Sequence, residues 1–461
     1  MDGKKKDFPH HSIVPLSQRV GLRVGMMRPI VIIGAGLAGC EAAWQIARRG
    51  AQVILYEMKP EVYSPAHRSP HFAEIVCSNS FKSESLDNAH GLLKAELERL
   101  DSLILSTAKE TRVPAGGCLA VDRTAFSRSV TQTLEGLKNL EIIRKEVNIL
   151  PGDRITIIAT GPLTSDGLSK EIQRIAGDRH LFFYDAISPI ITVESIDLRK
   201  TFNASRYNKG GDDYINCPMD REAYYHFVDA LRNAERVPIR DFEKRYLFEG
   251  CLPVEELADR GRETLAFGPL KPVGLVDPRT GAIPFAVVQL RPEDRNGESF
   301  NLVGFQTRLR QEEQRRVFRM IPGLEKAEFL RWGSVHRNTF INSPQLLTAS
   351  LEIKHVPDLY LAGQITGVEG YMESTAMGLL AGINALRKEM GKSLAPPPPT
   401  TAIGALVHHV VHSQATPFQP MNINFGLFPP LREMVKGRER KRALAERAIE
   451  DLEHWKAEYS I

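Results

Sequence analysis

The sequence has few cysteines, and no pattern groups them. The five cysteines lie far apart, at positions 40, 77, 118, 217 and 251, and no two of them form a C-x-x-C pair. This spacing argues against a disulfide framework and a structural zinc site, and it favours a reducing cytoplasm. We therefore expect no bound metal, and each cysteine needs an explanation in packing or in chemistry.

The sequence also lacks a long apolar run and a large net charge. No stretch approaches the roughly 20 apolar residues that span a bilayer, and the amino terminus lacks the apolar core of a signal peptide, so we expect no membrane insertion. The net charge is only +4, so a polyanionic partner would have to bind a local basic patch. Residues 1–26 mix charge, histidine, proline and glycine without periodicity, and we expect them to form a tail.

A glycine-rich turn is the strongest local signal. Residues 29–33 form an apolar run typical of a strand in a parallel sheet, and residues 39–49 have the apolar spacing of a helix. The turn between them matches G-x-G-x-x-G in the context that makes it a dinucleotide-binding motif. Its residues are Gly34, Ala35, Gly36, Leu37, Ala38 and Gly39. The glycines permit the turn, the approach of backbone to a pyrophosphate, and close helix packing.

A carboxylate ends the next predicted strand. Residues 53–56 form that strand, and Glu57 follows them. A carboxylate at this position can accept hydrogen bonds from both ribose hydroxyls and repels a 2′-phosphate. The unit therefore favours FAD or NAD over NADP and leaves the choice between FAD and NAD open.

Two later segments repeat the strand-then-glycine pattern. Residues 155–159 lead to Gly161, and residues 359–362 lead to a glycine-rich segment and a helix at 374–388. The candidate cofactor-binding residues of this late segment are Gly363, Gln364, Gly370, Tyr371 and Met372. Because such a segment suits close approach at the flavin end, FAD is the predicted cofactor.

The predicted fold class is α/β, a Rossmann-like FAD-binding domain of the glutathione-reductase type with an inserted α+β domain. We expect the first part of the FAD-binding domain at residues 27–183 and the inserted substrate domain at 184–335, where short alternating runs and polar loops replace the buried strands. Residues 336–461 would complete the FAD-binding domain and end in a charged helical tail.

Four motifs together identify a family. They are GAGLAGCEAAW at 34–44, CSNSFKS at 77–83, HRNTFINSP at 336–344 and GQITGVEGYMES at 363–374. With them, the chain closely resembles the bacterial folate- and FAD-dependent tRNA (uracil-5-)-methyltransferases from about residue 27 to its end. The resemblance implies transfer of a methylene group from 5,10-methylenetetrahydrofolate to C5 of the T-loop uridine of tRNA. Reduced FAD would supply the electrons, and NADH or NADPH would then reduce the flavin again.

Two cysteines match those implicated in the family's active site, Cys77 and Cys251. Carbon 5 of uracil is a poor nucleophile until a group such as a thiolate adds at C6. Cys251 precedes a predicted helix, where a thiol can have a lowered pKa, so we assign it as the nucleophile and Cys77 as the flavin-side partner. The residues do not decide between these roles. For Cys40, Cys118 and Cys217 the expected role is packing.

Candidate substrate residues lie in two other regions. The segment 332–344, which we expect to be a ligand-facing loop, offers Trp332 or His336 to stack on a pterin ring, and Arg337 or Asn338 for polar contacts with folate or flavin. The carboxyl-terminal tail contains the densest basic cluster, Arg438, Arg440, Lys441 and Arg442. This cluster fits a tRNA contact and, equally well, a solvated helix face.

Two other functions remain as alternatives. One is the flavoprotein that modifies wobble uridines in tRNA, which shares FAD and folate but carries a long helical extension and a C-N-P sequence at the cysteine loop. This chain reads C-S-N-S there. The other is a flavin oxidoreductase that acts on a small molecule, without nucleic acid.

Overall fold

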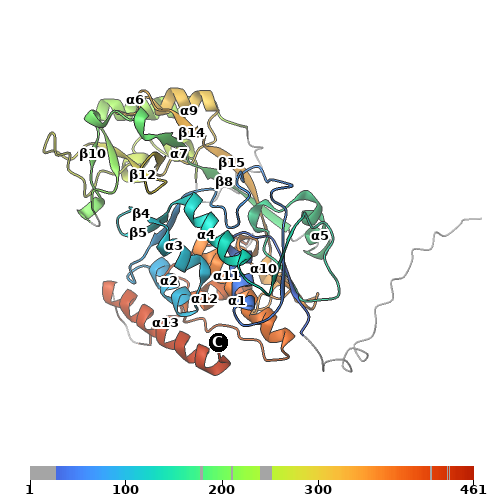
Figure 1. Ribbon diagram of the computed structural model, residues 1–461. Helices are drawn as coiled ribbons and strands as arrows, with labels where there is room; N and C mark the ends of the chain where they lie inside the picture. The colour runs from blue at the N-terminus through green and yellow to red at the C-terminus, as the bar shows by residue number, and fades with distance from the viewer. Residues whose placement is uncertain are drawn as a thin grey trace, which may run out of the picture.

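The computed structural model describes residues 27–176, 180–208, 211–238, 252–415, 418–432, 435 and 437–461, without the side chains of 180–187, 208, 335–339 and 438. The molecule has two lobes (Figure 1). The larger lobe holds the amino-terminal and carboxyl-terminal segments, and the smaller one holds the middle of the chain. Among the described residues, no helix combines the length and the apolar character that a membrane span requires.

A five-stranded parallel sheet forms the centre of the larger lobe, in the order β16-β7-β1-β2-β6. The strands are β1 (Ile30–Ile33), β2 (Val53–Glu57), β6 (Leu140–Arg144), β7 (Thr156–Ile158) and β16 (Leu359–Leu361). Four of them were predicted from buried apolar runs, and β16 joins the sheet late, as expected. The sequence analysis did not predict β6, whose residues are mostly half-buried at the sheet edge. The α/β fold class is confirmed.

Two helices pack tightly against each other beside this sheet. Helix α1 (Leu37–Ala47) begins and ends two residues before the predicted bounds, and Gly50 follows it with a φ of +85°. Helix α11 (Tyr371–Glu389) brings Gly378 and Gly382 against the backbone of Ala38 and Ala42. A methyl group at Gly378 would overlap the Ala38 carbonyl oxygen. The two helices can therefore lie this close together only because Gly378 has no side chain.

Further elements surround the sheet in the larger lobe. A small antiparallel sheet contains β3 (Ser80–Ser83), β5 (Cys118–Val121) and β4 (Arg112–Val113). The other helices are α2 (Ala89–Arg99), α3 (Leu103–Glu110), α4 (Arg123–Glu135), α5 (Asp166–Ala176), α10 (Ser343–Leu346), α12 (Ala402–His412) and α13 (Gly437–Tyr459). The long helix α13 lies against α2, at the bottom of Figure 1. It forms the expected helical tail, starting at residue 437 rather than 431.

The smaller lobe has its own antiparallel sheet and core. The six-stranded sheet has the order β10-β11-β12-β13-β9-β14. Its strands are β9 (Ile190–Thr192), β10 (Phe202–Asn203), β11 (Ile215–Met219), β12 (Ala286–Pro292), β13 (Ser299–Leu302) and β14 (Phe329–Arg331). The helices are α6 (Arg221–Arg232), α7 (Val254–Asp259), α8 (Thr264–Phe267) and α9 (Gln311–Phe318). A separate cluster of buried apolar side chains forms the core of this α+β unit.

A two-stranded ribbon connects the lobes. Strand β8 (His180–Ile187) pairs antiparallel with β15 (Ser334–Ile341) along its whole length. The expected loop at 332–344 is therefore wrong, because most of it is strand. The cysteine segment at 75–79 is irregular, and strand β3 starts only at Ser80. Both expected domain boundaries, after residues 183 and 335, fall inside the ribbon.

Candidate functional site

A cavity opens in the larger lobe at the carboxyl ends of β1, β2 and β7. It has about 1100 Å³ of empty volume, including its open mouth. The predicted site residues in its wall are Gly34, Ala35, Gly36, Leu37, Ala38, Glu57, Gly161, Gly363, Gln364 and Tyr371. Residues that are far apart in the sequence thus meet at one site. The carboxyl edge of a parallel sheet is where α/β folds bind nucleotides.

The glycines of the turn are required by its geometry. Gly34 has a φ of +101°, and a Cβ atom there would lie 2.7 Å from the Ala159 carbonyl oxygen. A Cβ atom at Gly39 would overlap the carbonyl oxygen of Gly34. At Gly36 the nearest atom would be 4.0 Å away, so its backbone is open to the cavity. Gly39 lies behind the wall and serves packing, while Gly36 leaves room for a phosphate near the start of α1.

Glu57 joins the turn to the end of β2. Its Oε2 atom accepts a hydrogen bond of 2.8 Å from the Ala35 amide, and its Oε1 atom accepts one of 3.0 Å from the Lys59 amide. The side chain is buried and lines the cavity. A carboxylate has about four acceptor positions, so two remain for other donors. The geometry therefore fits a ligand with vicinal hydroxyls, as on the ribose of a dinucleotide.

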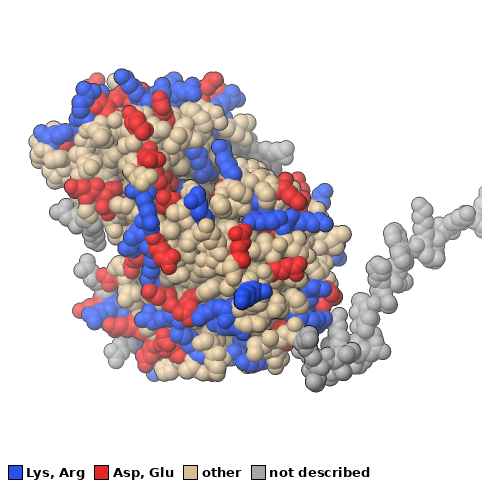
Figure 2. Space-filling model, viewed as in Figure 1, with Lys and Arg blue, Asp and Glu red and all other residues tan. Residues whose placement is uncertain are grey.

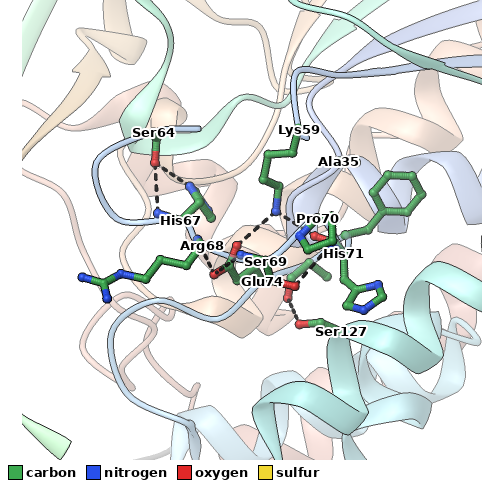
Figure 3. A network of polar contacts seen from close by, with 12 residues as sticks. Ala35, Lys59, Ser64, His67, Arg68, Ser69, Pro70, His71, Glu74 and Ser127 are labelled. Carbon is green, nitrogen blue, oxygen red and sulfur yellow. Dashed lines mark hydrogen bonds and ion pairs between the residues drawn. The ribbon is translucent and has the colours of Figure 1, made fainter. Parts of the chain in front are cut away.

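A polar network, not predicted from the sequence, forms the adjacent wall (Figure 3). Lys59 Nζ donates to the His71 carbonyl at 2.7 Å and pairs with Glu74 at 3.2 Å. The other oxygen of Glu74 accepts bonds from the amides of Arg68 and Ser69, at 2.8 and 3.1 Å. These contacts fix the loop between β2 and β3 on the cavity. No sequence motif in this segment predicts these contacts.

His67 lies in the same wall. Its Nδ1 atom is 2.6 Å from Ser64 Oγ, a contact drawn in Figure 3. Burial, and then the charge of Lys59, lower the pKa of this histidine. The ring is therefore neutral at pH 7, with one nitrogen acting as a donor and the other as an acceptor.

The late glycine segment forms the part of the wall beside the start of α1. Gly363 has a φ of +84°, and a Cβ atom there would lie 2.8 Å from the Ala38 side chain. Tyr371 lines the cavity, and its ring packs edge-on against Phe81 with the centroids 5.5 Å apart. Two predicted residues of this segment, Gly370 and Met372, are not part of the wall, and Met372 is buried in the core.

Cys77 lies one residue behind the wall. Its amide donates a hydrogen bond of 2.9 Å to the Tyr371 hydroxyl, and the neighbouring Val76 lines the cavity. The thiol-bearing residue is half-buried. The second candidate, Cys251, lies outside the described residues. The structure thus places one of the two candidate cysteines next to residues that line the cavity.

The other described cysteines have environments that suit packing. Cys40 and Cys217 are fully buried, and desolvation raises the pKa of both thiols. Desolvation also raises the pKa of Cys118, which lies in β5. A raised pKa keeps a thiol protonated and unreactive at neutral pH.

The candidate folate residues lie at and near the ribbon. Trp332 stacks on Phe329 with the ring centroids 4.4 Å apart, and the Arg315 guanidinium lies 5.4 Å from the Trp332 centroid. His336, Arg337 and Asn338 lie in β15, opposite Asp185, Tyr184 and Phe183. One face of Trp332 is thus already covered by Phe329.

The candidate tRNA residues lie on α13. Arg442 pairs with Glu446 at 2.8 Å, and both side chains are exposed. Arg438, Arg440 and Lys441 belong to the first turns of the same helix. Figure 2 shows basic and acidic side chains interleaved over this part of the larger lobe. An exposed pair of this kind contributes about 0–1 kcal/mol, so it does not prevent Arg442 from contacting a phosphate.

Comparison with known proteins extends over nearly the whole chain. The family model described as glucose inhibited division protein A matches residues 29–393. The methylenetetrahydrofolate–tRNA-(uracil-5-)-methyltransferase TrmFO of Geobacter sulfurreducens is 61% identical over 94% of this chain and 100% of its own length. The protein of the same name from Desulforamulus reducens is 57% identical over 92% of this chain and 97% of its own.

Solved structures show the same fold. GidA of Aquifex aeolicus, in its form II crystal, matches with a TM-score of 0.68 and 18% identity. The match covers 93% of this chain and 73% of that one. With such identity over the full length of the TrmFO proteins, this chain belongs to the methylenetetrahydrofolate–tRNA-(uracil-5-)-methyltransferases, within the glucose inhibited division protein A family.

Proposed function

We propose that this chain methylates C5 of the T-loop uridine of tRNA, with 5,10-methylenetetrahydrofolate as carbon donor and reduced FAD as electron donor. The observation that carries the proposal is the bond from the Cys77 amide to the Tyr371 hydroxyl, at the wall of a dinucleotide cavity. It holds a thiol-bearing residue next to two residues that line the cavity, Tyr371 and Val76. Relatives that are 61% and 57% identical to the chain over most of its length carry the name of this activity.

FAD fits the residues that line the cavity. Glu57 and the turn at 34–39 suit the ribose and pyrophosphate, Gly363 and Gln364 line the wall beside Ala38 of that turn, and Tyr371 is the candidate contact for the isoalloxazine ring. The bound flavin supplies the two electrons that convert a transferred methylene group into a methyl group. His67, Lys59 and Glu74 form another part of the same wall.

The remaining roles follow from this assignment. Cys251 is the proposed nucleophile at C6 of uracil, and Cys77 acts on the flavin side. The segment from Trp332 to Asn338 is the proposed folate contact, and Arg438, Arg440, Lys441 and Arg442 provide the phosphate contacts of tRNA. NADH or NADPH serves as reductant, and the activity belongs in the cytoplasm, where thiols stay reduced.

The proposal is tested by incubating purified protein with unmodified tRNA, methylenetetrahydrofolate and NADH or NADPH. We expect 5-methyluridine at the T-loop position alone, and none when folate is omitted. S-adenosylmethionine in place of folate is the matched control and should give no product. Methylation of an anticodon base, or none with all components present, would contradict the proposal.

We expect Glu57→Ala to weaken FAD binding by about 10- to 100-fold. The expected change corresponds to the loss of one hydrogen bond to a charged acceptor, worth about 1.5–3 kcal/mol, since tenfold in affinity is about 1.4 kcal/mol. The substitution also leaves the amides of Ala35 and Lys59 without their acceptor. Flavin fluorescence titration of the apoprotein measures the change. Glu61→Ala, an exposed glutamate in the following loop, is the control and should bind FAD like the wild type.

A further inference from the structure

The loop that carries Cys77 is held by the end of a strand in the other lobe. Strand β12 of the smaller lobe ends at Pro292, and Arg291, Pro292 and Glu293 all reach the segment from Ile75 to Asn79 or its neighbours. These residues are buried: Arg291 is 6% exposed, Glu293 4% and Asn79 0%. The contact is therefore a built interface between the lobes.

Arg291 makes the first set of contacts. Its Nε atom donates to Asn79 Oδ1 at 2.8 Å, and one terminal nitrogen donates to Ser78 Oγ at 2.7 Å. The Asn79 amide in turn donates to the carbonyls of Val121 and Pro292, each at 3.0 Å. Both amide protons and the amide oxygen of Asn79 are thus used, so its side chain cannot rotate without losing bonds in a buried site.

Arg123 makes the second set, from the first turn of α4. Its terminal nitrogens donate to the carbonyls of Ile75 and Cys77, each at 2.7 Å. The same guanidinium forms an ion pair with Glu293 through two of its nitrogens. Two main-chain carbonyls, one of them that of the cysteine itself, are therefore held by a side chain whose charge is balanced from the smaller lobe.

We propose that Arg291 and Arg123 are positioning residues that set the place of Cys77, and that the end of β12 transmits the position of the smaller lobe to this thiol. The role in the reaction rests on the proposed function; the placement of the loop does not. The segment 77–79 lies outside the strands, and among the described contacts its main chain is bonded to β5 only through the Asn79 carbonyl, which accepts from the Val121 amide at 3.0 Å. The side-chain bonds from Arg291 and Arg123 therefore hold the part of the loop that carries Cys77. A misplacement of about 1 Å in a reacting group can cost about 100-fold in rate.

Arg291→Lys separates geometry from charge, because lysine keeps the charge but lacks the rigid fork that reaches Ser78 and Asn79 together. We expect iodoacetamide to alkylate Cys77 about tenfold faster in this variant, and kcat for tRNA methylation to fall by about 10- to 100-fold with KM within about twofold. Ser78→Ala removes one bond only and should shift both quantities in the same direction by less. Peptide mass spectrometry of the flavin-bound protein measures the alkylated fraction of the Cys77 peptide, with a peptide that contains no cysteine as internal reference.

Arg279→Lys is the matched control, because Arg279 pairs with Asp277 in the same lobe and does not contact the cysteine loop. It should leave the alkylation rate and kcat at wild-type values. An unchanged alkylation rate of Cys77 in both Arg291→Lys and Ser78→Ala would overturn the proposal, as would faster alkylation without a loss of kcat. A wild-type protein that alkylates as expected but methylates no tRNA would instead reject the proposed function.

Discussion

Cys77→Ala is expected to lower kcat for 5-methyluridine formation by about 10²- to 10⁴-fold, the range for loss of a general acid or base, if the flavin-side role proposed for Cys77 is to donate a proton. The amide of Cys77 is fixed to Tyr371 at 2.9 Å, and Tyr371 lines the cavity. FAD should remain bound, because Cys77 itself lies behind the wall. Steady-state methylation and the flavin absorption of the same sample measure the two quantities.

Cys118→Ala is the matched control for this prediction. Cys118 lies in β5, which pairs with β3 just after the cysteine loop, and burial raises the pKa of its thiol. We expect its loss to leave kcat within about twofold of the wild type, as for a small buried residue replaced by alanine without a reactive role. Near-wild-type methylation by Cys77→Ala, or an equal loss in both variants, would remove Cys77 from the chemistry.

The fold was predictable where strands are buried on both faces. Strands β1, β2, β7 and β16 are short apolar runs, and the glycines after three of them mark the carboxyl edge of the sheet. Strand β6 was missed because it lies at the sheet edge, where Glu141 and Arg144 interrupt the apolar pattern. The ribbon strand β15 was missed because a polar run, His336 to Asn338, reads as a loop when its partner β8 is far away in sequence.

The parts of the candidate site that belong to a sequence motif were predictable, and the parts that do not were missed. The glycine turn and Glu57 have fixed spacing because they belong to a single β–α–β unit and, apart from Gly39, line one cavity. The wall formed by Lys59, His67 and Glu74 has no such spacing, since each side chain is placed by the loop that follows β2. The two bonds from Arg291 to the cysteine loop connect residues that are separated by 212 and 213 positions in the sequence. No local sequence pattern can therefore predict them.

Gly378→Ala is expected to destabilise the protein by about 1–3 kcal/mol or more, and to reduce its FAD content to below about a tenth. In an isolated helix, replacing glycine by alanine would stabilise the helix by about 1 kcal/mol. The sign of the change in the free energy of unfolding therefore tests whether α11 packs against α1 at this residue. The added methyl group would overlap the Ala38 carbonyl and lie 2.6 Å from the Ala38 Cα atom. Both are backbone atoms of α1, so relief requires moving the helix whose amino terminus forms the phosphate-binding turn.

A graded series separates this contact from a general effect of alanine. At Gly382 the nearest backbone atoms would be 2.9 and 3.0 Å away, and at Gly152 no atom would lie within 4 Å. Thermal unfolding with and without FAD should therefore rank Gly378→Ala as the most damaging, Gly382→Ala as intermediate and Gly152→Ala as neutral. A stabilised Gly378→Ala protein would mean that α1 and α11 do not meet at this glycine. In that case the contact between α1 and α11 would not be what holds the turn at 34–39 in the conformation that leaves room for the pyrophosphate.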